Sequence, residues 1–174
     1  NNNSNIVGIH YRDVDSKYDS MDINNNDIVN FTLNSPFKAF EEVIQKFKKD
    51  NTYFIVISNN SKIKDKFRES FPSLNFISSE TSLFDRCDTN AMIDSIVDFI
   101  ILTKCNILIG TYFSSFSDEA SLFNVVPKIT PLSEERIKNI TSTVQNYHCV
   151  NYSYIDNIAA LNFNDKIFLD YLIF

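Results

Sequence analysis

Residues 98–117 read Asp98-Phe-Ile-Ile-Leu-Thr-Lys-Cys-Asn-Ile-Leu-Ile-Gly-Thr-Tyr-Phe-Ser-Ser-Phe-Ser117. An apolar segment ends in a polar turn at 104–106, and the short apolar run 107–109 that follows predicts a buried strand. A cluster of serines then stands where the next helix would begin. In an open α/β sheet, the carboxyl end of a strand followed by a helix N-terminus is where phosphates bind. Ser114, Ser115 and Ser117 therefore either receive an anion or simply cap the helix.

Apolar strands alternate with amphipathic helices on both sides of this unit. The order predicts a Rossmann-like three-layer α/β/α domain with a mostly parallel sheet of five to six strands. Ser35-Pro36 is a typical helix start. Residues 16–34 read as a loop, with a short strand near 28–32. Predicted strands are 6–12, 52–58, 74–77, 106–109, 125–129 and an edge strand at 148–152, and predicted helices are 37–47, 62–70, 90–103, 114–123 and 133–145.

The 174 residues are expected to form one domain, with a flexible lead-in at 1–5 and a C-terminal extension, 153–174, that packs on it. A net charge of −6 argues against binding nucleic acid. The three cysteines are far apart, show no metal-ligand spacing and are expected to be reduced, with Cys105 in the core. No signal peptide or transmembrane run is recognisable, and the compartment cannot be read from the chain.

Only two glycines are present, so the chain has neither the Gly-x-Gly-x-x-Gly fingerprint nor a phosphate-binding loop of the Gly-Lys-Ser/Thr kind. Nicotinamide-dependent enzymes and P-loop nucleotidases are therefore poor hypotheses. Gly8 and Gly110 both fall in predicted strands, where glycine can mark a close approach to the backbone.

His10 and Arg12 lie at the end of the first predicted strand and point to the same face of it. Arginine can hold a diphosphate through two parallel hydrogen bonds. The alternative is a surface arginine paired with Asp13 or Asp15. Asp13-Val-Asp15 also has the Asp-x-Asp form that some sugar-nucleotide enzymes use to hold a divalent cation.

The predicted helix 90–103 is apolar nearly all round, which indicates burial. Asn90, Asp94 and Asp98 form one polar line along it. This line is either the solvent-facing stripe of the helix or a site. As a site, Asp98 could accept two hydrogen bonds from guanine, which carries the required N–H and amino groups where adenine does not.

His10-x-Arg12-x-x-Asp15 after an apolar strand resembles the HxRxxD motif of the GDP-fucose-dependent fucosyltransferases, a group that includes the α1,6-, α1,2- and protein O-fucosyltransferases. The stretch from Asp98 through Ile107-Leu-Ile-Gly-Thr111 to Ser114-Ser115 resembles the last nucleotide-binding motif of that superfamily. The two motifs occur in the expected order, and with the alternating pattern the resemblance spans most of residues 6–130.

The resemblance implies the C-terminal half of a two-domain GT-B glycosyltransferase that transfers a sugar from GDP-fucose to a hydroxyl acceptor on a glycan or protein. Arg12 would hold the β-phosphate as the catalytic residue, and Asp15 would orient it. His10 and Asp98 would lie against the guanine, and Ser114 and Ser115 would meet the diphosphate. No cofactor and no metal are implied, and an N-terminal partner domain outside this chain would complete the enzyme.

Two positions depart from the family pattern. Asp13 stands where the family usually has a second basic residue, and Ser58-Asn59-Asn60 stands where it has an acidic pair. Two other functions therefore stay open. One is a degenerate module that binds a nucleotide or glycan without transferring sugar, and the other is a metal-dependent sugar-nucleotide enzyme that uses Asp13 and Asp15.

Overall fold

The computed structural model describes residues 5–13, 31–48, 51–78, 88–138 and 167–169. A six-stranded sheet in the order β3-β2-β1-β4-β5-β6 forms its centre. Strands β1 to β5 are parallel, and β6 pairs antiparallel with β5. The strands are β1 (Asn5–Tyr11), β2 (Thr52–Ser58), β3 (Asn75–Ile77), β4 (Ile107–Gly110), β5 (Lys128–Pro131) and β6 (Ile167–Leu169).

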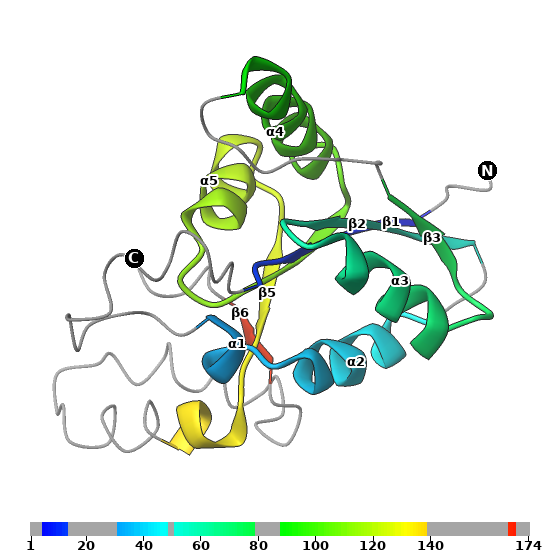
Figure 1. Ribbon diagram of the computed structural model, residues 1–174. Helices are drawn as coiled ribbons and strands as arrows, with labels where there is room; N and C mark the ends of the chain where they lie inside the picture. The colour runs from blue at the N-terminus through cyan, green and yellow to red at the C-terminus, as the bar shows by residue number, and fades with distance from the viewer. Residues whose placement is uncertain (1–4, 14–30, 49–50, 79–87, 139–166, 170–174) are drawn as a thin grey trace, which may run out of the picture.

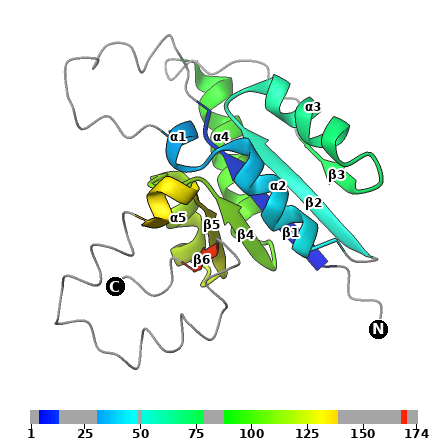
Figure 2. The ribbon, with the colours of Figure 1, turned by 90° about the horizontal axis from the view of Figure 1, so that it is seen from below.

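Helices cover both faces of the sheet, so the domain has the expected Rossmann-like three-layer fold (Figure 1). Helices α2 and α3 lie on one face, and α4 and α5 lie on the other. Seen from below, α1 lies beside α2 near the end of the sheet (Figure 2). The helices are α1 (Phe31–Asn34), α2 (Phe37–Lys46), α3 (Ser61–Ser70), α4 (Thr89–Leu102) and α5 (Ser115–Phe123), and residues 134–138 are also helical.

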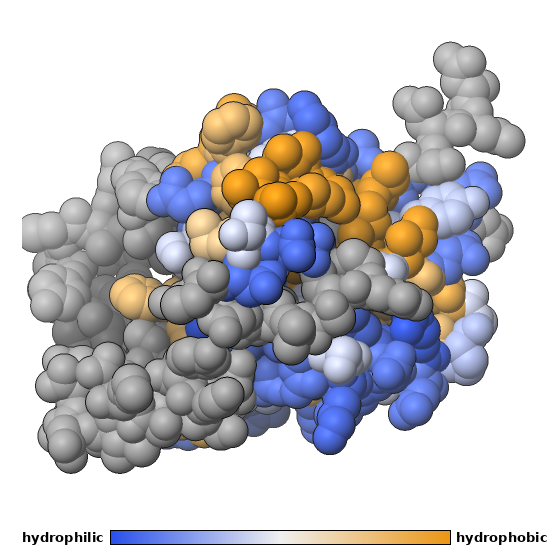
Figure 3. All heavy atoms as spheres, turned by 45° about the horizontal axis from the view of Figure 1, so that its top comes forward, coloured by the Kyte–Doolittle hydropathy of each residue, from blue (hydrophilic) through white to orange (hydrophobic). Residues whose placement is uncertain are grey.

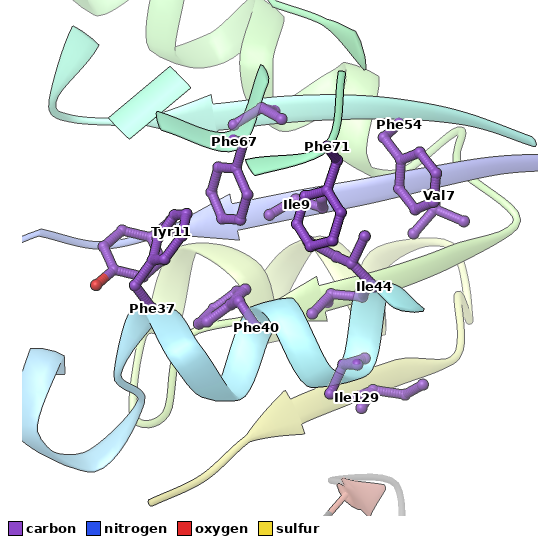
Figure 4. Packing of buried hydrophobic residues seen from close by; sticks show 13 residues of the cluster. Val7, Ile9, Tyr11, Phe37, Phe40, Ile44, Phe54, Phe67, Phe71 and Ile129 are labelled. Atoms are coloured by element: carbon purple, nitrogen blue, oxygen red, sulfur yellow. The ribbon is translucent and has the colours of Figure 1, made fainter. Parts of the chain in front are cut away.

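The core between the sheet and helices α2 and α3 is built largely of aromatic rings (Figure 4). Tyr11 of β1 contacts Phe40 of α2 with ring centroids 4.9 Å apart, and Phe37 and Phe67 lie 4.5 Å apart. Such ring pairs bury large areas and add about 0.5–1.5 kcal/mol each beyond that burial. The alternate residues of β1 face α4 and α5, where a second cluster contains Leu102, Cys105 and Leu108. Burial raises the pKa of the Cys105 thiol to about 11, so it is a core thiol, as predicted.

Gly8 fits that second cluster because it has no side chain. A Cβ built there would lie 2.7 Å from Cδ2 of Leu108 and 2.8 Å from Sγ of Cys105. The expected close approach is therefore present at Gly8, and neighbouring core side chains make it.

Most predicted elements are confirmed to within a few residues, and the exceptions have local causes. Residues 31–34 form one helical turn, so the strand predicted near 28–32 is wrong at Phe31 and Thr32, where the alternating pattern was too short to identify a strand. Strand β5 starts at Lys128, three residues later than predicted, and Val125 instead adopts a left-handed backbone with φ of 53°. Several predicted segments lie outside the described residues: the lead-in up to residue 4, residues 16–30 of the loop, residues 139–145 of the last helix, the strand at 148–152 and all of the C-terminal extension except β6.

Helix α4 is not buried all round, which corrects the prediction from its composition. Only Asp98 and Leu102 in this helix are buried, while Ile93, Ile96 and Ile100 are 50–56% exposed. The polar line of Asn90, Asp94 and Asp98 therefore runs from the exposed surface into the interior, and Asp98 does not face solvent. Burial of a carboxylate requires a partner, and Asp98 attracts the buried ammonium of Lys64 on α3.

Candidate functional site

Hydrogen bonds of Thr111 connect the carboxyl ends of β1 and β4 beyond the last paired residues of the two strands. His10 lies opposite Gly110 in the register of the two strands. The hydroxyl of Thr111 donates a hydrogen bond to the carbonyl of His10 (3.1 Å) and accepts one from the backbone N–H of Arg12 (2.8 Å). The N–H of Thr111 also donates to the carbonyl of His10 (3.1 Å). These bonds tie the backbone of Arg12 to Thr111, the first residue after β4.

His10 is 7% exposed and carries a buried Nδ1 with no hydrogen-bond partner in the part of the chain that the structure describes. Its ring lies 5.0 Å from the ring of Phe116 on α5. Burial, with further contributions from Arg12 and Lys128, lowers its pKa to about 3. The imidazole is therefore neutral at physiological pH and keeps one unused polar atom, which is an unusual arrangement in a core.

Arg12 is partly buried, and its Nε also has no hydrogen-bond partner within the described residues. The guanidinium lies 5.5 Å from the ring centroid of Phe31 on α1. An arginine whose guanidinium lies over an aromatic ring can still present its planar donors to an anion.

Ser114 occupies the N-cap position of α5, but its side chain makes no capping hydrogen bond. The Ser117 hydroxyl donates to the Ser114 carbonyl (3.2 Å), and Ser115 is exposed. The interpretation of these serines as helix caps is therefore not supported at Ser114. The first N–H groups of α5 have no side-chain cap, and a helix terminus in that state attracts an anion.

Gly110 permits close packing beneath this loop. A Cβ built on Gly110 would lie 2.6 Å from Cε of Lys128 and 2.6 Å from Oγ of Ser117. The close approach expected at Gly110 is thus confirmed, and it brings a buried cation under the end of β4.

Lys128 was not anticipated by sequence reasoning. Its side chain is 1% exposed, and its ammonium donates to the carboxylate of Asp118 and to the hydroxyl of Thr130 (3.1 Å). The available signal was a lysine at the start of an apolar strand, which gives no hint of burial by itself. Lys128 adds positive charge next to His10, in a chain that is acidic as a whole.

Asp98 lies on the α4 side of the sheet and is 4% exposed. Burial lowers the pKa of Lys64, and the negative charge of Asp98 partly opposes this shift. The ring of Phe116 contacts both His10 and Phe99, the neighbour of Asp98, so β1, α5 and α4 meet at that ring. Lys64 is a second buried cation that the sequence did not reveal, because the rest of α3 reads as a solvated basic helix.

Asp13 is held by the loop after β2. Its backbone N–H and carbonyl exchange hydrogen bonds with the Asn59 side chain (2.7 and 2.9 Å), and its carboxylate accepts from the Asn60 amide (2.6 Å). The two departures from the fucosyltransferase pattern therefore contact each other. Asp15, the other carboxylate of the motif, lies outside the described residues.

Tyr112 and Arg136 were also missed by sequence reasoning. The guanidinium of Arg136 lies 4.6 Å from the ring centroid of Tyr112 and donates a hydrogen bond to its hydroxyl. The Tyr112 N–H donates to the hydroxyl of Ser35, which in turn donates to the carbonyl of Pro131. A second arginine thus contacts the loop that follows β4, and only the fold brings it there.

Within the described ranges, no group of three or more His, Cys, Asp or Glu side chains could hold a metal ion. No helix among the described residues is both long enough and apolar enough to cross a membrane.

The site thus combines partly buried guanidinium groups, uncapped N–H groups at a helix N-terminus and a neutral histidine with a free ring nitrogen. The first two complement a negatively charged group, and the third can donate to or accept from a polar ligand. His10, Arg12 and Ser114 are brought together at the ends of β1 and β4. Asp98 lies deeper, on the α4 side, and Ser115 lies on the exposed surface of α5.

No family model matches the sequence, and no curated protein matches it either. Solved structures with a similar arrangement include NodZ α-1,6-fucosyltransferase co-crystallised with GDP, with a TM-score of 0.49, 13% sequence identity, and coverage of 72% of this chain and 37% of that one. The same enzyme soaked with GDP-fucose gives a TM-score of 0.47, 13% identity, and coverage of 76% and 39%. Selenomethionine NodZ from Bradyrhizobium gives a TM-score of 0.44 and 18% identity, with coverage of 72% of this chain and 37% of that one. The chain therefore spans less than two fifths of the length of these proteins.

Proposed function

We propose that this domain binds a nucleoside-diphosphate sugar, with GDP-fucose as the donor, and takes part in transferring the sugar to a hydroxyl acceptor. The diphosphate would lie at the carboxyl ends of β1 and β4, between Arg12 and the N-terminus of α5. The proposal joins the resemblance of the sequence motifs to the position of these residues in the fold.

The single observation that carries the proposal is the pair of unsatisfied polar atoms at the carboxyl end of β1. Nδ1 of His10 and Nε of Arg12 are both buried without a hydrogen-bond partner in the described structure. Leaving a buried polar group unpaired costs about 1–3 kcal/mol. A bound ligand at this place would satisfy both atoms, and the uncapped start of α5 faces the same loop.

The chemical task in such a transfer is to stabilise the departing diphosphate while the sugar gains positive charge. Arg12 would supply two charge-assisted hydrogen bonds to phosphate oxygens, and the N–H groups of Ser115 and its neighbours would supply the helix-terminus contribution. Ser114, whose hydroxyl is not used as a cap, would contact the same diphosphate. Asp15 would orient Arg12, and the acceptor's general base would come from outside the described residues.

The direct test is a thermal-shift titration of the protein with GDP, UDP, ADP and CMP, each with and without Mn²⁺. We expect GDP to raise the melting temperature without metal. A response to no nucleotide would overturn the proposal, and a response that depends on Mn²⁺ would favour the metal-dependent enzyme.

Recognition of guanine is assigned to Asp98 and His10, and it has its own test. In Asp98→Asn, the side chain keeps its size but has only one acceptor oxygen to offer to the guanine edge. We expect this variant to lose preference for GDP over ADP while Arg12 still binds the phosphates. If Asp98→Asn keeps the full preference, Asp98 serves only to balance Lys64.

One observation favours binding without sugar transfer as a second candidate function. The carboxylate of Asp13 occupies the position next to Arg12 and is fixed there by Asn60. A negative charge at that point weakens the stabilisation of a departing diphosphate. GDP binding without any consumption of GDP-fucose, measured with the full-length protein and a panel of acceptors, would establish this second function.

A further inference from the structure

Helix α4 and the end of α5 expose a set of large apolar side chains, here called the α4 face. Figure 3 shows apolar side chains gathered on the side of the molecule where α4 lies in Figure 1. The α4 face consists of Met92 (52% exposed), Ile93 (52%), Ile96 (56%), Val97 (47%) and Ile100 (50%) on α4, and Leu122 (51%) and Phe123 (76%) on α5.

The two helices form one continuous surface. The ring of Phe123 lies 5.9 Å from the ring of Phe99 on α4. The side chain of Asn124 donates a hydrogen bond to the carbonyl of Thr103, just after α4 ends (2.8 Å). The α4 face therefore extends over two helices that pack against each other.

The size of the α4 face is that of a protein interface. At roughly 150–200 Å² for a fully exposed large apolar residue, an area close to that of an aromatic side chain, the seven residues expose roughly 600–750 Å². That exceeds the apolar patch of about 300–600 Å² found on a typical monomer. It approaches the total of about 800 Å² that each partner contributes to a standard stable interface.

The composition of helix α4 is that of a helix covered on both sides. A helix that is apolar all round is normally buried all round. The domain itself covers only the side that carries Asp98 and Leu102. The opposite side therefore requires a covering surface that the described part of this domain does not supply.

Charge around the α4 face points to a second copy of the chain as the occupant. No charged side chain is among its seven members. Exposed charges of both signs lie at four-residue spacing, Lys104 after Ile100 and Glu119 before Phe123, with Asp94 half-buried on α4. A membrane surface would instead require a basic rim, and the chain has a net charge of −6. A surface that is neutral at its centre and mixed at its rim can pack on itself.

The spacing of the side chains also suits self-association. Met92, Ile96 and Ile100 form one ridge at four-residue spacing, and Ile93 and Val97 form a second beside it. Ridges of this spacing interdigitate with those of a like helix at a crossing angle of about −50°. We propose that the α4 face is a homodimer interface in which α4 packs against α4 of a second copy.

The test is the mass of the protein in solution, measured by sedimentation velocity and light scattering over a concentration series. We expect the unmodified protein to form a dimer. We expect Ile96→Asp to raise the dissociation constant of that dimer at least about 10-fold, because each copy would bury a charge at the centre of the interface. Ile100→Asp, on the same ridge, should act in the same way. Circular dichroism checks that both variants remain folded, as expected for exposed positions.

Ile77→Asp is the matched control, because Ile77 is 53% exposed but lies on β3 at the far edge of the sheet. It should dimerise like the unmodified protein. A protein that is monomeric at every concentration overturns the proposal, as does a control that dissociates equally. Monomers that bind anionic lipid vesicles through the α4 face would also overturn it and would identify a membrane as the occupant.

Discussion

Arg12 is the residue on which nucleotide binding should depend most. We expect Arg12→Ala to weaken binding of GDP by about 10- to 100-fold, the loss of one or two charge-assisted hydrogen bonds. Isothermal titration calorimetry measures the change. Arg68→Ala is the matched control, since that arginine lies on the outer side of α3 and bonds to Asp65 at 2.8 Å. Unchanged GDP affinity in Arg12→Ala would show that the phosphate assignment is wrong.

His10 makes stability depend on pH. Its pKa is about 3 in the folded protein and about 6.5 in an unfolded chain. As the pH falls from 6.5 towards 3, the unfolded chain takes up a proton that the folded protein does not. The free energy of unfolding therefore decreases over this window, by up to about 1.4 kcal/mol per pH unit from this residue, and its contribution is fully present only above pH 6.5.

Urea unfolding at a series of pH values measures this effect. We expect His10→Gln to show a shallower loss of stability between pH 6.5 and 4 than the unmodified protein. His148→Gln, which removes the only other histidine, should retain the steep slope. Equal slopes in the unmodified protein and His10→Gln would mean that His10 is not held neutral by burial.

At the scale of elements, Asn60 joins the start of α3 to the end of β1. Its Oδ1 accepts from the Lys62 N–H as an N-cap (3.0 Å), while its Nδ2 donates to Asp13 (2.6 Å). Asn60→Asp would keep the cap but place two carboxylates in contact. We expect the free energy of unfolding to fall by about 1–3 kcal/mol at pH 7 and to recover partly below pH 4, when the carboxyls take up protons.

Asn60→Ser provides the control for this experiment, because a serine caps the helix without adding a charge. Chemical unfolding of the two variants at both pH values separates capping from repulsion. If Asn60→Asp is as stable as the unmodified protein at pH 7, the contact with Asp13 does not hold the strand end in place.

Strand β2 and helix α2 show why parts of the fold could be predicted from the sequence. Strand β2 is a continuous apolar run, and α2 places Phe37, Phe40 and Ile44 at helical spacing, so local pattern determines both. The orientation of α4 could not be predicted, because a helix with apolar residues on every side gives no period to follow. Only tertiary packing shows which side faces inward, the side that carries Asp98 and Leu102.

At the candidate site, the residues that belong to sequence motifs could be predicted. The residues that only tertiary packing brings to the site could not. His10, Arg12 and Ser114 lie in two short stretches, and parallel pairing of β1 with β4 necessarily brings their ends together. Lys64, Lys128 and Arg136 come from other elements, and their burial or stacking depends on tertiary packing. Nothing in their local sequence distinguishes them from surface cations.

On the scale of the whole molecule, self-association would couple stability to concentration. If only the folded protein dimerises, mass action favours the folded state as the concentration rises. We expect differential scanning calorimetry to show a melting temperature that increases by a few degrees over an about 100-fold rise in protein concentration. The melting temperature of Ile96→Asp should not change with concentration. A constant value for the unmodified protein would contradict dimerisation through folded domains.

The hydroxyl of Thr111 makes the hydrogen bonds to the backbone of His10 and Arg12 that the main chain of a longer β4 would otherwise make. The chain can therefore leave the sheet at Thr111 without releasing the backbone of Arg12. Insertions or deletions between Tyr112 and Ser114 would change the loop and leave the position of Arg12 intact, whereas one inserted residue before Thr111 would displace this anchor. During divergence, the part of the site that contacts the ligand can thus vary in length while the arginine stays in place.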